Sequence, residues 1–232
     1  MSPKFTSFKG GDVESLGYLH RRFFFLKRPA AVLGDPLDIM TYIATRFAAE
    51  SGVTATRVLG TGTMLDTARF RSLLGAVLDI DPQHVHGYVV GEHGDSEVLT
   101  WSLATVGAMG LEDFCKRRSI LFDEDLKRRV DDGVRNAAYS IIAGKGATYY
   151  GIGSAIAKLV DVILHDQRSI LTVSTMTSLT GGVTDVSISL PNLVGGNGIL
   201  ETLPLPLNTE ESAELKRSAE ILKAEIEKIN IE

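Results

Sequence analysis

The chain has 232 residues, 44% of them hydrophobic and 23% charged, which excludes disorder throughout and is enough for a real core or for two small domains. Its formal net charge of -5 argues against a protein that binds nucleic acid or an anionic membrane, because either function would require a basic face. The single cysteine, Cys115, excludes an internal disulfide and a structural zinc site, and it favours a reducing, cytoplasmic setting.

The first thirty residues differ from the rest of the chain. Basic residues, glycines and isolated aromatics alternate there without a helical or strand period, so we predict an atypical, poorly ordered segment over residues 1–30. Its longest apolar run, Phe23-Phe24-Phe25-Leu26, is far shorter than the roughly 20 residues of a membrane span. We therefore expect no membrane partner.

The pattern between residues 31 and 60 predicts a strand, a helix and a second strand. A turn at Gly34-Asp35-Pro36 precedes the helix, and Gly52 ends it. Alternation of strand and helix is typical of an α/β unit. The expected elements are a strand over residues 30–33, a helix over 37–50 and a strand over 57–60.

Residues 61–232 mix helices with antiparallel strands. The segment Thr63-Met64-Leu65-Asp66 has the Ser/Thr-x-x-Asp/Glu form of a helix start, and Asp81-Pro82 follows the end of that helix. We therefore expect an α/β remnant joined to an α+β domain. The expected elements are helices over 63–78, 123–145 (stopped by Gly144 and Gly146), 148–165 and 210–230, a strand over 85–90, and a hairpin of strands 170–175 and 183–190 turning at Thr180-Gly181-Gly182.

Two short segments carry residues suited to chemistry. Asp66 and Arg69 are three positions apart on the predicted helix, so a carboxylate and a guanidinium share one face. His93 lies between glycines, directly after a predicted strand, which is a common position for catalytic groups. Taken singly, these residues also fit a surface ion pair and an ordinary loop histidine. Only their convergence in space would make a site.

From about residue 31 to its C-terminus, the chain resembles the L-lactate dehydrogenases of the lactate/malate dehydrogenase family, especially the bacterial members. Three matches in the right order carry the resemblance. They are Asp66-Thr67-Ala68-Arg69-Phe70-Arg71, Gly91-Glu92-His93-Gly94-Asp95-Ser96-Glu97-Val98, and Lys145-Gly146-Ala147-Thr148 followed by Gly151-Ile152.

The resemblance implies a remnant of a Rossmann dinucleotide-binding domain over residues 31–60 and a C-terminal catalytic, substrate-binding domain over 61–232. It also implies an NAD-dependent oxidoreductase of carboxylic acid metabolism that interconverts lactate and pyruvate. By the same resemblance, the protein is expected to be a cytoplasmic homo-oligomer, a homotetramer in this family, with no metal.

Individual roles follow from the same resemblance. His93 is implied as the general acid and base, Asp66 as the residue that orients it, and Arg69 as the ligand of the substrate carboxylate. Oxidation of lactate releases the hydroxyl proton together with the C2 hydride, so a base with a pKa near neutrality belongs at the hydroxyl. Further implied contacts are Thr148 and Asp35 for the substrate, and Thr61 and Ile152 for the cofactor.

Arg71 and His86 occupy positions that bind fructose 1,6-bisphosphate between subunits in the allosteric bacterial enzymes of the family. The alternative is that both are solvated surface residues. The sequence leaves these two interpretations open.

The chain also departs from the family. No glycine starts a Gly-x-Gly-x-x-Gly loop, since Gly60-x-Gly62 is followed by Leu65 and Gly151-x-Gly153 by Ile156. The acidic residue for the ribose, and the mobile loop that separates lactate from malate specificity, are missing as well. Asp35 stands where the family has asparagine. We therefore expect impaired turnover, and two alternatives stay open: a malate dehydrogenase-like enzyme, and a non-catalytic subunit or effector-binding module.

Overall fold

The computed structural model describes residues 29–34, 36–146, 148–177 and 180–229. Five of its strands form a central mixed sheet: β1 (Ala30–Val32), β2 (Val58–Gly60), β8 (Ser169–Thr177), β9 (Val186–Gly195) and β10 (Gly198–Thr202), ordered β1-β2-β8-β9-β10. β1 and β2 are parallel, whereas β2 with β8, β8 with β9, and β9 with β10 are antiparallel pairs. The segment predicted to be poorly ordered covers residues 1–30, and residues 1–28 lie outside the described ones.

The predicted α/β unit is present. Helix α2 (Leu37–Glu50) connects the parallel strands β1 and β2, and it has the predicted bounds. Gly52, with φ of 74°, follows its end. The pairing of Gly60 with Ser174 joins β2 to β8 of the predicted hairpin. The α/β unit and the hairpin therefore share one continuous sheet.

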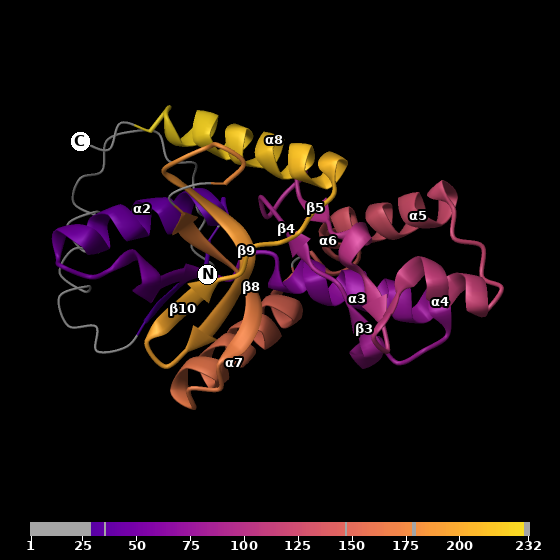
Figure 1. The fold of residues 1–232 in the computed structure, drawn as a ribbon. Coiled ribbons are helices and arrows are strands. Elements are labelled where there is room, and N and C mark those ends of the chain that lie inside the picture. The colour runs from indigo at the N-terminus through magenta and orange to yellow at the C-terminus, as the bar shows by residue number, and fades with distance from the viewer. Residues whose placement is uncertain (1–28, 35, 147, 178–179, 230–232) are drawn as a thin grey trace.

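Helices cover both faces of this sheet (Figure 1). Helix α2 and the C-terminal helix α8 (Thr209–Ile226) pack on one face, and helix α7 (Tyr149–Leu164) packs on the other. Alternate residues of the strands point to opposite sides, which supplies an apolar layer to each. The first layer includes Ile39, Tyr42, Val186, Ile188, Ala219, Leu222 and Ile226, and the second Leu59, Leu159, Val162, Ile163, Val173, Val194 and Ile199.

A second group of elements packs beside the sheet (Figure 1). Its core surrounds Phe70, which is fully buried and meets Trp101 edge to face at 5.0 Å between ring centroids. The helices are α3 (Met64–Leu78), α4 (Leu111–Arg117), α5 (Glu124–Arg135) and α6 (Ala137–Lys145), and the strands are β3 (Val85–His86), β6 (Thr105–Val106) and β7 (Met109–Gly110) in one small sheet and β4 (Val89–Val90) and β5 (Val98–Leu99) in another. Three single turns of 3-10 helix complete the described elements: Ala55–Arg57, Pro82–His84 and Trp101–Leu103.

Two local predictions are wrong. The helix predicted over 123–145 is two helices, because the backbone at Asn136 leaves helical geometry between α5 and α6. The strand predicted over 85–90 is divided between two sheets at Gly87, where a Cβ atom would lie 2.8 Å from the ring of Phe70. The helix start predicted at Thr63 is confirmed, because α3 begins at Met64 with Thr63 as its N-cap residue; the Thr63 hydroxyl, however, donates to the carbonyl of Val89 at 2.6 Å and not to the helix.

Strands β5, β6, β7 and β10 and helix α4 have no counterpart among the predicted elements. All five are only two to seven residues long, too short for a period of two or of 3.6 to stand out. Among the described helices, none combines the length and apolar character needed to cross a membrane.

Candidate active site

The loop that carries His93 is anchored to the central sheet. It runs from the end of β4 to the start of β5, and Gly91 exchanges two backbone hydrogen bonds with Ser189 of β9, at 2.9 and 3.0 Å. Gly91 has φ of 95°, a conformation that favours glycine. The backbone is therefore fixed two residues before the histidine.

Asp66 binds both His93 and Arg69. It lies in the first turn of α3 and is only 3% exposed. Its Oδ2 is 2.7 Å from Nδ1 of His93, and its Oδ1 accepts a hydrogen bond from Nη1 of Arg69, also at 2.7 Å. The structure thus brings together three residues that the sequence places in two distant segments.

A second buried carboxylate, which the sequence analysis did not single out, holds the backbone of His93. Asp38, in the first turn of α2, accepts a hydrogen bond from the His93 N–H at 2.7 Å and one from the hydroxyl of Ser174 at 2.5 Å. A periodic signal was available, because Asp38, Thr41 and Thr45 are spaced three and seven apart and all face the interior. A polar stripe among apolar neighbours indicates buried polar contacts.

The surroundings of His93 favour its protonated form. Burial lowers the pKa of His93, but the hydrogen bond and charge of Asp66, followed by the charges of Asp38 and Glu97, outweigh that effect and raise the pKa to about 9. The imidazole is therefore a cation at neutral pH. With Nδ1 on Asp66, its second nitrogen, Nε2, is the one left to exchange a proton with a ligand.

Two neighbouring acids hold their protons more tightly than usual. Burial raises the pKa of Asp38 to about 6, against the opposing effect of its bonds from Ser174 and His93. Burial, followed by the charge of Asp66, also raises the pKa of Glu97, which is 4% exposed. Arg135 of α5 donates to the carbonyl of Glu97 at 2.7 Å and so fixes this end of the loop.

The remaining residues predicted to contact substrate or cofactor make no hydrogen bond to His93, Asp66 or Arg69, as far as the described residues show. Thr148 precedes α7 and Ile152 lies in its first turn. Between them, Gly151 faces Leu65, the neighbour of Asp66: a Cβ atom at Gly151 would lie 3.5 Å from the leucine side chain. Thr61 follows β2 and is 2% exposed. Asp35 lies outside the described residues.

Arg71, one of the two predicted effector residues, binds the chain neighbour of the other, His86. Nε of Arg71 donates to the carbonyl of Gly87 at 2.9 Å, and its guanidinium lies 5.1 Å from the centroid of the Tyr88 ring. His86 is exposed on β3, next to Gly87 in the chain. Arg71 therefore contacts the residue that follows His86, and the protein itself partly engages its guanidinium.

The described residues do not fit the pyrophosphate of a dinucleotide. A phosphate-binding loop needs glycines whose missing side chains leave room for the ligand. At Gly60 a Cβ would instead collide with Thr41, and at Gly62 it would lie 2.5 Å from the carbonyl oxygen of Thr172. This glycine pair permits close packing between β2 and β8.

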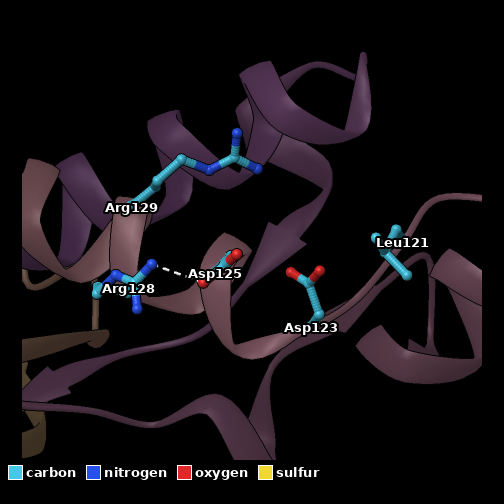
Figure 2. Close-up of a pocket in the computed structure, with 5 residues that line it drawn as sticks. All are labelled: Leu121, Asp123, Asp125, Arg128 and Arg129. Carbon is cyan, nitrogen blue, oxygen red and sulfur yellow. Dashed lines mark hydrogen bonds and ion pairs between the residues drawn. The ribbon is translucent and has the colours of Figure 1, made fainter.

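A separate pocket lies at the start of α5 (Figure 2). It has a volume of about 340 Å³ and is lined by Leu121, Asp123, Asp125, Arg128 and Arg129. The ion pair between Arg128 and Asp125, 2.6 Å long, is exposed on both sides and is an ordinary surface contact. None of these residues binds the His93 centre, and among the described residues no cluster of His, Cys, Asp and Glu could hold a metal ion.

Comparisons with known proteins agree with this geometry. Residues 63–232 match the family model of the lactate/malate dehydrogenase, alpha/beta C-terminal domain. The chain is 54% identical over 200 residues to an L-lactate dehydrogenase of Geotalea daltonii, covering 86% of this chain and 64% of that protein. It is 52% identical over 198 residues to the L-lactate dehydrogenase of Thermus aquaticus, covering 84% and 63%.

Solved structures lead to the same family. The ligand-bound form of a minor L-lactate dehydrogenase from Enterococcus mundtii aligns with a TM-score of 0.85 and 34% identity, over 98% of this chain and 74% of that one. A lactate dehydrogenase from a deep-sea metagenome library aligns with a TM-score of 0.84 and 34% identity, over 91% and 68%. The chain therefore has the fold of these enzymes but spans 64% of the length of the first curated relative.

Proposed function

Because this chain belongs to the lactate/malate dehydrogenase family, we propose that it forms the substrate-binding and proton-transferring part of an L-lactate dehydrogenase-type oxidoreductase. The observation that carries the proposal is the convergence of His93 and Arg69 on the two oxygens of Asp66. An acid–base group and a carboxylate-binding group thus stand side by side. That pair suits a small 2-hydroxy or 2-oxo acid.

Arg69 binds the substrate carboxylate in this proposal. A guanidinium presents donors in a planar fork that matches the two oxygens of a carboxylate, and its charge strengthens both bonds. Among the described residues its one hydrogen bond is made through Nη1, and 21% of its side chain is exposed. From the family resemblance, we assign Thr148 to the wall of the same substrate site and Asp35 to a further substrate contact.

His93 exchanges the proton. Asp66 fixes the orientation of the imidazole through Nδ1, so that Nε2 gives its proton to the ketone oxygen of pyruvate, or takes the hydroxyl proton of lactate in the reverse direction. Because the pKa of His93 is raised to about 9, the free protein at neutral pH holds the proton that reduction of a 2-oxo acid consumes. The acid form is therefore ready before substrate arrives.

Family membership supports NAD as the hydride carrier, with Thr61 and Ile152 near its nicotinamide end. The described residues supply no phosphate-binding loop, so much of the binding energy of a dinucleotide is missing. This chain by itself therefore binds NADH weakly and turns over slowly. Mixing it with NADH and pyruvate, and then with oxaloacetate, measures that turnover and separates a lactate from a malate preference.

Calorimetric titration with pyruvate tests the substrate site without requiring turnover. The Arg69→Ala variant should bind pyruvate about 10 to 100 times more weakly than the unmodified chain, because it loses a charge-assisted pair of hydrogen bonds. Arg71→Ala is the matched control, since it removes a guanidinium from the same helix that engages Gly87 and Tyr88 instead. Equal affinities of the two variants would refute the proposed role of Arg69.

The proximity of Arg71 to His86 favours a second function, binding of fructose 1,6-bisphosphate as an effector. Calorimetry with this sugar, repeated on Arg71→Ala, tests it: an affinity that the substitution leaves unchanged would make both residues ordinary surface groups. Family membership likewise supports a cytoplasmic homo-oligomer. Sedimentation at several protein concentrations measures the state of assembly.

A further inference from the structure

We propose that Asp38 is a positioning residue for the reaction: it holds the backbone of His93 against the central sheet and so keeps the imidazole aligned on Asp66. This inference rests on the proposed function, because only that function gives His93 a role in the reaction. It adds a residue of the α/β unit to a centre that otherwise consists of α3 and the β4–β5 loop.

Two carboxylates hold His93 from opposite parts of the residue. Asp66 binds ring atom Nδ1 and Asp38 binds the main-chain N–H, each at 2.7 Å. Both acids are 3% exposed, and they come from the first turns of two different helices. With the main chain held on one side and the ring on the other, the imidazole has little freedom to swing away from Asp66.

Asp38 is itself fixed by the sheet. Its second oxygen accepts the hydroxyl of Ser174, the residue of β8 that pairs with Gly60. A Cβ at Gly60 would lie 3.1 Å from Cβ of Ser174, and one at Gly62 would lie 2.6 Å from its backbone nitrogen. Only glycine at these two positions lets β2 come this close to Ser174. The Gly-x-Gly pair thus supports the centre through packing.

The hydrogen bond from the His93 N–H to Asp38 lies among buried charged side chains, so removing Asp38 acts locally on the loop that carries His93. Asp38 faces His93 and Glu92 of the loop, while Asp66, Arg69, Glu97 and Arg135 surround the same loop from α3, α5 and the loop itself. Without Asp38, the N–H of His93 loses its acceptor in the protein interior. The loop is then free to open, and the ring leaves Asp66 more often.

The experiment compares Asp38→Ala and Asp38→Asn with a matched control, Glu211→Ala. Glu211 is also a buried carboxylate in the first turn of a helix, and it accepts a backbone N–H, that of Ser102 at 2.8 Å, and the hydroxyl of the same serine. The full chain is used throughout. Three quantities are recorded by NMR and by urea unfolding: hydrogen exchange of the His93 amide, pH titration of the His93 ring, and global stability.

The proposal predicts that Asp38→Ala speeds exchange of the His93 amide about tenfold or more beyond the global change and lowers the pKa of the ring. Asp38→Asn, whose amide oxygen still accepts the His93 N–H, restores most of the protection, and Glu211→Ala leaves His93 unchanged. The proposal is overturned if Asp38→Ala and Glu211→Ala have the same effect on His93. If Asp38→Ala fails to fold, Ser174→Ala, which removes only the second bond, must still speed exchange at His93.

None of these readouts uses pyruvate or a dinucleotide. A chain that does not bind pyruvate but shows the Asp38 effect would refute the proposed function and leave the positioning of His93 intact. A chain that binds pyruvate through Arg69 but shows no Asp38 effect would refute only the positioning role.

Discussion

Arg69 and Asp66, one turn apart on helix α3, are joined by a hydrogen bond of 2.7 Å between Nη1 and Oδ1. The carboxylate of Asp66 thus occupies one donor of the arginine to which we assign the substrate, while its other oxygen binds His93. One buried acid therefore fixes the distance between His93 and Arg69. Four predictions test this site and the packing around it.

The first prediction concerns Asp66→Asn. Removing the charge of Asp66 takes away the chief contribution that raises the pKa of His93, so this pKa should fall well below 9. The measurement is the pH titration of the imidazole signals by NMR, with exposed His165 as an internal reference in the same spectra. An unchanged titration of His93 would show that its proton is held by something else.

The second prediction is that stability falls as pH rises. The folded-state pKa of Asp38 is raised from 3.8 to about 6 and that of His93 from 6.5 to about 9. A raised pKa contributes stability that is fully present below the unfolded value and is lost as pH rises through the folded one. The free energy of unfolding should therefore decline in two steps, around pH 4 to 6 and pH 6.5 to 9, of roughly 1 to 3 kcal/mol each.

Two variants separate these steps. Asp38→Asn should remove the lower step and His93→Gln the upper one, because neither replacement titrates in this range. Urea unfolding at half-unit intervals from pH 4 to 10 measures both. A profile that keeps its upper decline in His93→Gln would assign that decline to other groups, with Glu97 as the first candidate because its pKa is also raised.

The third prediction uses two glycines with nearly the same backbone φ angle. Gly62 has φ of 55° and Gly107 has φ of 54°, so an alanine at either position is strained by about 1 kcal/mol. At Gly62 the new Cβ also meets the Thr172 carbonyl at 2.5 Å, whereas at Gly107 nothing lies within 4 Å. Gly62→Ala should cost clearly more stability in urea unfolding, and equal losses would contradict the packing account.

Sequence reasoning reached parts of this site for identifiable reasons. The three-residue spacing of Asp66 and Arg69 places them on one helical face, and the structure joins them directly. The contact of His93 with Asp66 depends on how two distant segments fold together, and only the family resemblance indicated that these two residues meet. The bounds of α2 were predictable because its apolar period is regular and Gly52 ends it.

What the sequence missed has a common physical cause. Thr63 matches a capping pattern, yet tertiary structure offers its hydroxyl the carbonyl of Val89 instead. Asp38 looks like an ordinary acid in a first helical turn until the loop of His93 and strand β8 fold against it. In both cases a polar side chain close to a helix start takes a partner from far along the chain, which local patterns do not encode.

The fourth prediction concerns dinucleotide binding. Gly60, at the end of β2, and Gly62, just after it, pack against protein and leave no open loop. Fluorescence titration with NADH should therefore show an affinity at least about tenfold weaker than that of an intact L-lactate dehydrogenase, such as that of Thermus aquaticus measured alongside. Comparable affinity would mean that these 232 residues form a dinucleotide site of another kind.

The most direct measurement follows the imidazole of His93 by NMR while pyruvate is added at neutral pH. If Arg69 and His93 form one substrate site, the ring signals should shift in a saturable way in the unmodified chain and in Arg71→Ala, and should stay still in Arg69→Ala. A shift that persists in Arg69→Ala, or signals that do not respond to pyruvate in the unmodified chain, would contradict the assignment.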